Sequence, residues 1–82
     1  MSNQIKPETY SMGRPVVHFL NILTDEERES VPNDINRISR LYVMAQNKAR
    51  DFGGIKFHNR SFGGGIVFPS IEHLNDLAQT MD

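Results

Sequence analysis

The chain has 82 residues and a formal net charge of −1, with 38% hydrophobic residues and no cysteine. This length allows one domain with a modest core, so dimerisation or a bound partner is a further way to gain stability. The lack of cysteine excludes disulfides and thiolate metal sites. The longest apolar stretch, 16–23, is too short to span a bilayer, and no apolar run follows a basic start. We therefore expect a cytoplasmic protein without a membrane-spanning segment.

The first part of the chain is predicted to contain an arm and then a strand. Residues 1–13 are polar and show no apolar periodicity, which is typical of a flexible N-terminal arm. Residues 14–82 are expected to form a single domain. In the stretch 16–23 both alternating sets are largely apolar, as in a central strand that is covered on two faces. A helix beginning at Pro15 is the alternative, because a short apolar run has no decisive period.

A short helix is predicted to follow. Thr24 and Glu27 have the spacing of a capping box, in which each side chain bonds to the backbone amide of the other residue. The acidic residues of this segment also suit the positive end of a helix. The helix should run to about Ser30, because Pro32 cannot continue it.

A longer amphipathic helix is predicted to begin near Asn33. Its apolar residues recur at spacings of three and four, which places them on one face of a helix. Gly53 and Gly54 then stop the helix, since glycine tolerates the backbone conformations found at helix ends. The residues of this predicted buried face are Ile35, Ile38, Leu41, Tyr42, Ala45, Ala49 and Phe52.

Two short β-prone runs, 55–58 and 65–68, predict an antiparallel hairpin of undetermined register. Ile55 and Phe57 are expected to point inward. The three glycines at 63–65 permit either a bulge or space for an aromatic ring such as Phe57.

A terminal helix is predicted after Ser70, which is a good helix cap. Its apolar stripe comprises Ile71, Leu74, Leu77, Ala78 and Met81. The elements together predict an α+β domain in the order β-α-α-β-β-α. A small, mostly antiparallel sheet of about three strands would be packed by the long helix and the terminal helix.

Charge is unevenly distributed along the chain. Residues 37–60 contain six basic residues against one acid, a balance of +5, whereas the rest contains three basic residues against nine acids, a balance of −6. Such a division can orient a partner and speed its encounter with the protein.

One strip of the long helix is a candidate docking surface. The strip lies beside the predicted buried face and comprises, at spacings of three and four, Arg37, Arg40, Met44 and Lys48. Arginine and methionine are both favoured at interfaces, so this mixture suits an acidic protein surface or a phosphate backbone. The alternative is an ordinary solvated helix face with one exposed methionine.

The predicted hairpin carries a second basic group. Lys56 and His58 share a face if the alternation holds, and Arg60 lies at or near the turn. With Phe62 they combine cations and an aromatic ring, which is typical of single-stranded nucleic-acid binding. The alternative for Phe62 is packing in the core or the turn.

No catalytic or metal-binding motif stands out. His18, His58 and His73 are the only histidines, and none has the spacing that pairs two ligands on a helix. The nearest candidate for nucleophilic catalysis, His58 with Ser61, has no sequence-adjacent orienting acid. We therefore expect no metal, no cofactor and no enzymatic activity.

These features favour a non-catalytic binding or regulatory protein that occludes or bridges a surface on a larger protein or nucleoprotein complex. The size and divided charge suit a bacterial or bacteriophage accessory protein, such as an inhibitor of a host complex. The first alternative is a small RNA- or DNA-binding module that uses residues 37–60. The second is a non-catalytic or incomplete subunit of an enzyme, and a homodimer is compatible with each of these.

Overall fold

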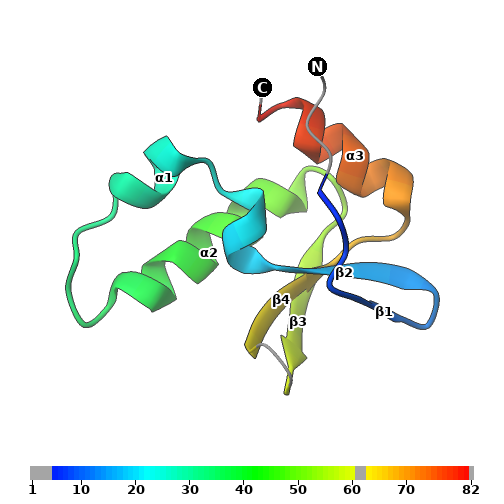
Figure 1. The fold of residues 1–82 in the computed structure, drawn as a ribbon, viewed down its shortest axis with the longest axis horizontal. Helices are drawn as coiled ribbons and strands as arrows, with labels where there is room; N and C mark the ends of the chain where they lie inside the picture. Colours follow the sequence, from blue (N-terminus) through cyan, green and yellow to red (C-terminus); the bar gives the residue numbers. More distant parts are fainter. Residues whose placement is uncertain (1–4, 61–62, 82) are drawn as a thin grey trace.

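The computed structural model describes residues 5–60 and 63–81 and has an α+β fold (Figure 1). Within these residues, four strands form one antiparallel sheet in the order β1-β2-β4-β3, accompanied by three α-helices and a 3₁₀ helix. The elements are β1 (Thr9–Ser11), β2 (Arg14–His18), the 3₁₀ helix η1 (Phe19–Ile22), α1 (Asp25–Glu29), α2 (Arg37–Arg50), β3 (Ile55–Asn59), β4 (Gly63–Val67) and α3 (Ile71–Gln79). The predicted fold class and element order are confirmed, although the sheet has four strands and not about three.

The additional strand, β1, lies within residues 1–13, which were predicted to be a flexible arm. Thr9 of β1 is opposite Val16 of β2, and the Glu8 amide donates to the Val16 carbonyl at 2.8 Å. Ile5 also packs against the core. A strand of three residues offers too few positions to show an alternating pattern, so its sequence gave no signal.

The stretch 16–23 is neither a single strand nor a single helix. The strand β2 ends at His18, whose Nδ1 accepts a hydrogen bond from the Leu20 amide at 3.3 Å, and η1 follows. β2 is central, between β1 and β4, as predicted. Phe19 and Ile22 are buried in η1. The apolar run is therefore buried both in the strand β2 and in the 3₁₀ helix that follows it.

Helix α1 begins at the predicted capping box. Thr24 Oγ1 accepts a hydrogen bond from the Glu27 amide at 3.1 Å, and Glu27 Oε1 accepts one from the Thr24 amide at 2.8 Å. The helix ends at Glu29, and none of its five residues is buried. The helix is therefore held by the buried residues that flank it, Leu23 and Val31, together with its polar contacts.

Helix α2 begins at Arg37, later than the predicted start near Asn33. Leu41, Ala45 and Ala49 are buried, at successive spacings of four residues. These small and medium side chains allow α2 to lie close to the sheet. Tyr42, Met44 and Phe52 are partly buried and pack against the same core.

The first part of the predicted buried face is exposed. Ile35 precedes the helix and is 96% exposed, and Ile38 is 60% exposed. The prediction that both are buried is wrong. In Figure 1 the first turn of α2 projects past the sheet, so Ile38 has the right angular position on the helix but lies beyond the strands.

Strands β3 and β4 form the predicted hairpin. Their register runs without interruption from Ile55 opposite Val67 to Asn59 opposite Gly63. No bulge interrupts this paired region, although a bulge was one of the two predicted roles for the glycines.

The other predicted role, space for a ring, applies to Gly64. A Cβ atom on Gly64 would lie 2.7 Å from the ring of Tyr42 on α2. The ring that uses this space is therefore Tyr42, and not Phe57 as suggested from the sequence. The Tyr42 hydroxyl donates to the Gly65 carbonyl at 3.1 Å and so joins helix and sheet.

Helix α3 closes the chain. The Ser70 hydroxyl caps it by accepting from the His73 amide, and Leu74, Leu77 and Ala78 are buried as predicted. No helix within residues 5–60 and 63–81 is long and apolar enough to cross a membrane. The buried core cluster comprises Val17, Phe19, Ile22, Leu23, Val31, Leu41, Ala45, Ala49, Ile66, Phe68, Leu74 and Leu77.

Candidate protein-interaction surface

Arg37, the first residue of α2, binds backbone carbonyls of the segment that precedes it. Its guanidinium donates to the carbonyl of Val31 and to the carbonyl of Arg28, the latter at 2.7 Å. Arg28 lies in the last turn of α1, where carbonyl groups have no partner within the helix. Arg37 therefore satisfies the C-terminal end of α1 with a positive charge, which also suits the helix dipole.

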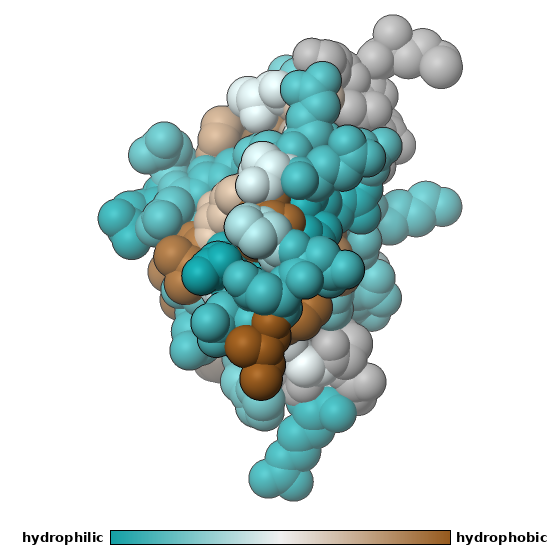
Figure 2. Space-filling model, turned by 90° about the vertical axis from the view of Figure 1, so that its left-hand side faces the viewer, coloured by the Kyte–Doolittle hydropathy of each residue, from teal (hydrophilic) through white to brown (hydrophobic). Residues whose placement is uncertain are grey.

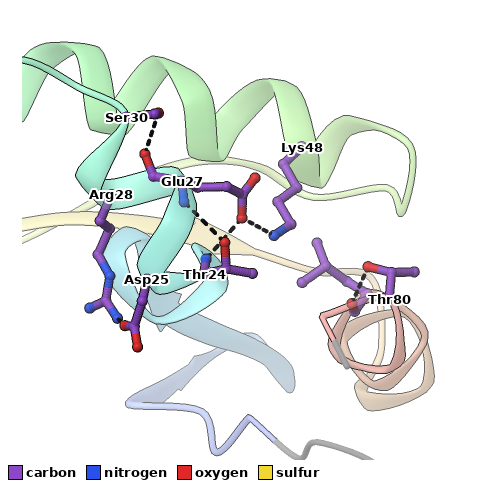
Figure 3. Close-up of polar contacts among 8 residues, drawn as sticks. Thr24, Asp25, Glu27, Arg28, Ser30, Lys48 and Thr80 are labelled. Carbon is purple, nitrogen blue, oxygen red and sulfur yellow. Dashed lines mark hydrogen bonds and ion pairs between the residues drawn. The ribbon is translucent and has the colours of Figure 1, made fainter.

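Two further cations of α2 form ion pairs with the same preceding segment. Lys48 Nζ lies 2.6 Å from Glu27 Oε1, and both side chains are largely shielded from solvent, at 18% and 32% exposed. Figure 3 shows these two side chains directed toward each other between α1 and α2. Arg40 Nη1 lies 3.0 Å from Asp34 Oδ2 in a more exposed pair.

The electrostatic environment of Glu27 reflects this contact. Partial burial by itself raises the pKa of Glu27, but hydrogen bonds from Lys48 and Thr24 and the charge of Lys48 outweigh it. The pKa therefore lies below its ordinary value. The carboxylate is charged at neutral pH and links the cap of α1 to α2.

Met44, the apolar member of the predicted strip, is half-buried and packs against the core. The structure thus places Arg37, Arg40 and Lys48 at the contact between α2 and residues 24–36. Partner binding by this strip stays a prediction. A partner that bound this strip would have to displace the contacts of these three side chains with residues 24–36.

The register of the hairpin shows which way its side chains face. Residues directly opposite each other in an antiparallel pair share a face. Lys56 is opposite Ile66, which is buried, and His58 is opposite Gly64, which lies against α2. Lys56 and His58 therefore share a face, and it is the face that α2 covers.

Ile55 and Phe57 lie on the other face of β3. Ile55 is 61% exposed and Phe57 is half-buried. The prediction that Ile55 points inward is wrong. The alternation was identified correctly, but the face that the helix covers could not be assigned from β3 alone.

Lys56 and Arg60 of the hairpin are exposed. Lys56 Nζ lies 5.6 Å from the centroid of the Tyr42 ring, within the range of a cation–π interaction. No carboxylate within residues 5–60 and 63–81 forms an ion pair with Lys56 or Arg60. His58 is also exposed. Phe62 lies outside the described residues, so its predicted role stays a prediction.

Several large apolar side chains also reach solvent. Figure 2 shows one face on which brown apolar surface is interspersed with teal polar side chains. No pattern in the sequence marked Val43 as exposed, and Ile55 was predicted to point inward. The exposed large apolar residues are Tyr10, Met12, Ile35, Ile38, Val43, Ile55 and Ile71.

A shallow, open hollow of about 730 Å³ separates the N-terminal segment from α1 and the end of α3. Several of its polar groups are already engaged, because the Thr24 hydroxyl caps α1 and Asp25 pairs with Arg28. In the part of the chain that the structure describes, no three His, Cys, Asp or Glu side chains are grouped so that they could hold a metal ion. The hollow is therefore a weaker candidate site than the hairpin.

A family model matches residues 2–81, nearly the whole chain, and is described as Staphylococcus phage terminal repeat-encoded protein TreK. The chain belongs to this family. Membership confirms the prediction of a phage accessory protein, whereas binding and inhibition stay predictions. No curated protein and no solved structure shows a significant match to the chain.

Proposed function

We propose that this TreK-family protein is a non-catalytic binding protein that occludes an acidic surface on a larger protein or nucleoprotein complex of the infected cell. It would act as a regulator or inhibitor by occupying that surface. Membership of a phage family supports action on a complex from a Staphylococcus host.

One observation carries the proposal. The cations of α2 bind the chain's own carbonyls and carboxylates, whereas Lys56, His58 and Arg60 are exposed at the hairpin. Lys56 and Arg60 form no ion pair with the described residues, and Ile55 is exposed on the other face of the same edge strand. Exposed cations close to exposed apolar side chains suit a surface that recognises an acidic partner. We define Ile55, Lys56, Phe57, His58 and Arg60 as the hairpin surface.

The absence of catalysis is part of the proposal and rests on the engagement of the polar groups. The Ser70 hydroxyl contacts His73 Nδ1 at 2.7 Å and also caps α3, on an exposed part of the surface. Such a pair is open to water. Nucleophilic catalysis requires tight geometry and the exclusion of water, so this pair does not suit it.

The test is capture from a Staphylococcus lysate with the full chain. A double variant, Lys56→Glu with Arg60→Glu, is compared with the matched control Lys6→Glu with Arg14→Glu, which makes the same charge change at other exposed positions. We expect a partner that the parent and the control retain and that the hairpin variant retains at least about tenfold less. Equal capture by all three proteins would refute the proposed role of the hairpin surface.

Nuclease treatment decides between a protein partner and the nucleic-acid alternative. Capture that survives nuclease supports a protein surface. Loss of capture with nuclease, together with an affinity that falls log-linearly with salt at a slope of about −0.7 to −0.9 per phosphate, would instead indicate a nucleic-acid-binding module.

A further inference from the structure

The two edges of the sheet differ in a way that bears on partner binding. At one edge, β1 has only three residues. At the other, β3 has five residues in a regular, unbulged register with β4, and no other strand within residues 5–60 and 63–81 pairs with it. Natural proteins usually shorten, bulge or cover an exposed edge, because its free amide and carbonyl groups can pair with another chain. Within the described residues, the edge of β3 is neither shortened nor bulged, and no other strand pairs with it.

Lysine on an edge strand often serves to prevent such pairing. Lys56 is directed over the ring of Tyr42 on α2, with its Nζ 5.6 Å from the ring centroid. Its charge therefore lies above the helix-covered face of the sheet and not across the path of an added strand. Tyr42 also fixes the edge in place, because its hydroxyl contacts the carbonyls of Phe57 and Gly65 at 3.4 and 3.1 Å.

The two faces of β3 differ in chemistry. One face presents Ile55 and Phe57, which are exposed and half-buried, respectively. The other presents Lys56 and His58, both exposed. A strand added beside β3 would place its own alternate side chains next to these two sets.

We infer that β3 is a strand-addition site for an extended acidic segment of the partner, in which acidic and apolar residues alternate. The acidic side chains would lie beside Lys56 and His58, and the apolar ones beside Ile55 and Phe57. Backbone hydrogen bonds supply affinity in this mode of binding, and the alternate side chains supply specificity. The inference rests on the proposed function and specifies the form of the partner.

A second copy of this chain fits the same edge less well. Pairing two β3 strands would bring the exposed Lys56 and Arg60 of both copies to the same pair of strands. Like charges brought together across a strand pair oppose pairing. Charge complementarity therefore favours an acidic segment over self-association.

The experiment uses the full chain and a synthetic peptide of about seven residues, within the usual range of strand lengths, in which Glu and Val alternate. We expect the peptide to bind and to slow hydrogen exchange at outward-facing amides of β3. N-methylation of alternate peptide amides should weaken binding at least about tenfold, and so should Lys56→Glu in the protein. A peptide in which Lys replaces Glu should bind at least about tenfold more weakly.

Binding of the N-methylated peptide with unchanged affinity would overturn the inference, because charge alone would then explain it. No binding at millimolar peptide, or dimerisation of the chain through β3, would overturn it as well. With any of these three results, the proposed function would still stand if capture from the lysate depended on Lys56 and Arg60. If capture is independent of these charges, the proposed function itself fails.

Discussion

Helix α2 and the β3–β4 hairpin are both basic in the sequence, yet they use their charge differently. On α2, Arg37 and Lys48 bind carbonyls and a carboxylate of the preceding segment. On the hairpin, Lys56 and Arg60 form no ion pair with the described residues. The comparison teaches that a basic run in a sequence indicates a binding surface only where the acids of the same chain do not neutralise it.

The largest expected effect concerns the two ends of the apolar stripe on α2. Leu41→Asp should unfold the protein, at a cost above about 4 kcal/mol, because it buries an unpaired carboxylate in the core. Ile38→Asp should change the free energy of unfolding by less than about 1 kcal/mol, since Ile38 is mostly exposed. Chemical denaturation followed by circular dichroism measures both. Equal damage at the two positions would show that α2 does not project past the sheet.

The next effect compares one lysine from each basic region. Lys48→Glu should lower the free energy of unfolding by about 1 to 2 kcal/mol, because it places a second carboxylate beside Glu27. The same change at Lys56 should cost less than about 0.5 kcal/mol. Reversing both members of the pair, as Glu27→Lys with Lys48→Glu, should recover part of the loss. A comparable loss at Lys56 and Lys48 would contradict the distinction between a lysine paired with Glu27 and one that forms no ion pair with the described residues.

The smallest effect is a pH dependence at Glu27. Because the folded pKa is lowered, Glu27 contributes its stability fully above the ordinary carboxyl pKa of 4.5 and loses it as the pH falls through the lower folded value. Glu27→Gln keeps an oxygen that can accept from the Thr24 amide but removes the ion pair. The variant should be about 0.5 to 1 kcal/mol less stable at pH 7, with the difference shrinking below pH 4.5. A difference that is constant across this range would exclude the ion pair as its cause.

Features that depend on neighbouring residues were predictable from the sequence. The capping box of α1 joins Thr24 and Glu27, three residues apart, and the cap of α3 joins Ser70 and His73. The alternation in β3 likewise correctly placed Lys56 and His58 on one face. Periodicity also predicted the buried residues in the second half of α2.

The errors occurred where a distant part of the chain determines the environment. The wheel position of Ile38 is that of a buried residue, but the first turn of α2 projects past the sheet and Ile38 is 60% exposed. Ile55 was assigned to the wrong face because only Gly64 and Ile66, on the opposite strand, show where α2 lies. The partners of the basic strip on α2 were likewise not evident from its spacing.

By itself, the sequence determined the order of the predicted elements, the caps of α1 and α3 and the α+β class, because these depend on local hydrogen bonds and on the period of apolar residues. The tertiary structure alone decided which cations are neutralised, which face of the hairpin α2 covers, and which sheet edge is open. Glu27 and Lys48 are 21 residues apart, and Tyr42 and Gly65 are 23 apart. Contacts at such separations depend on how the chain returns upon itself, and no local pattern encodes that path.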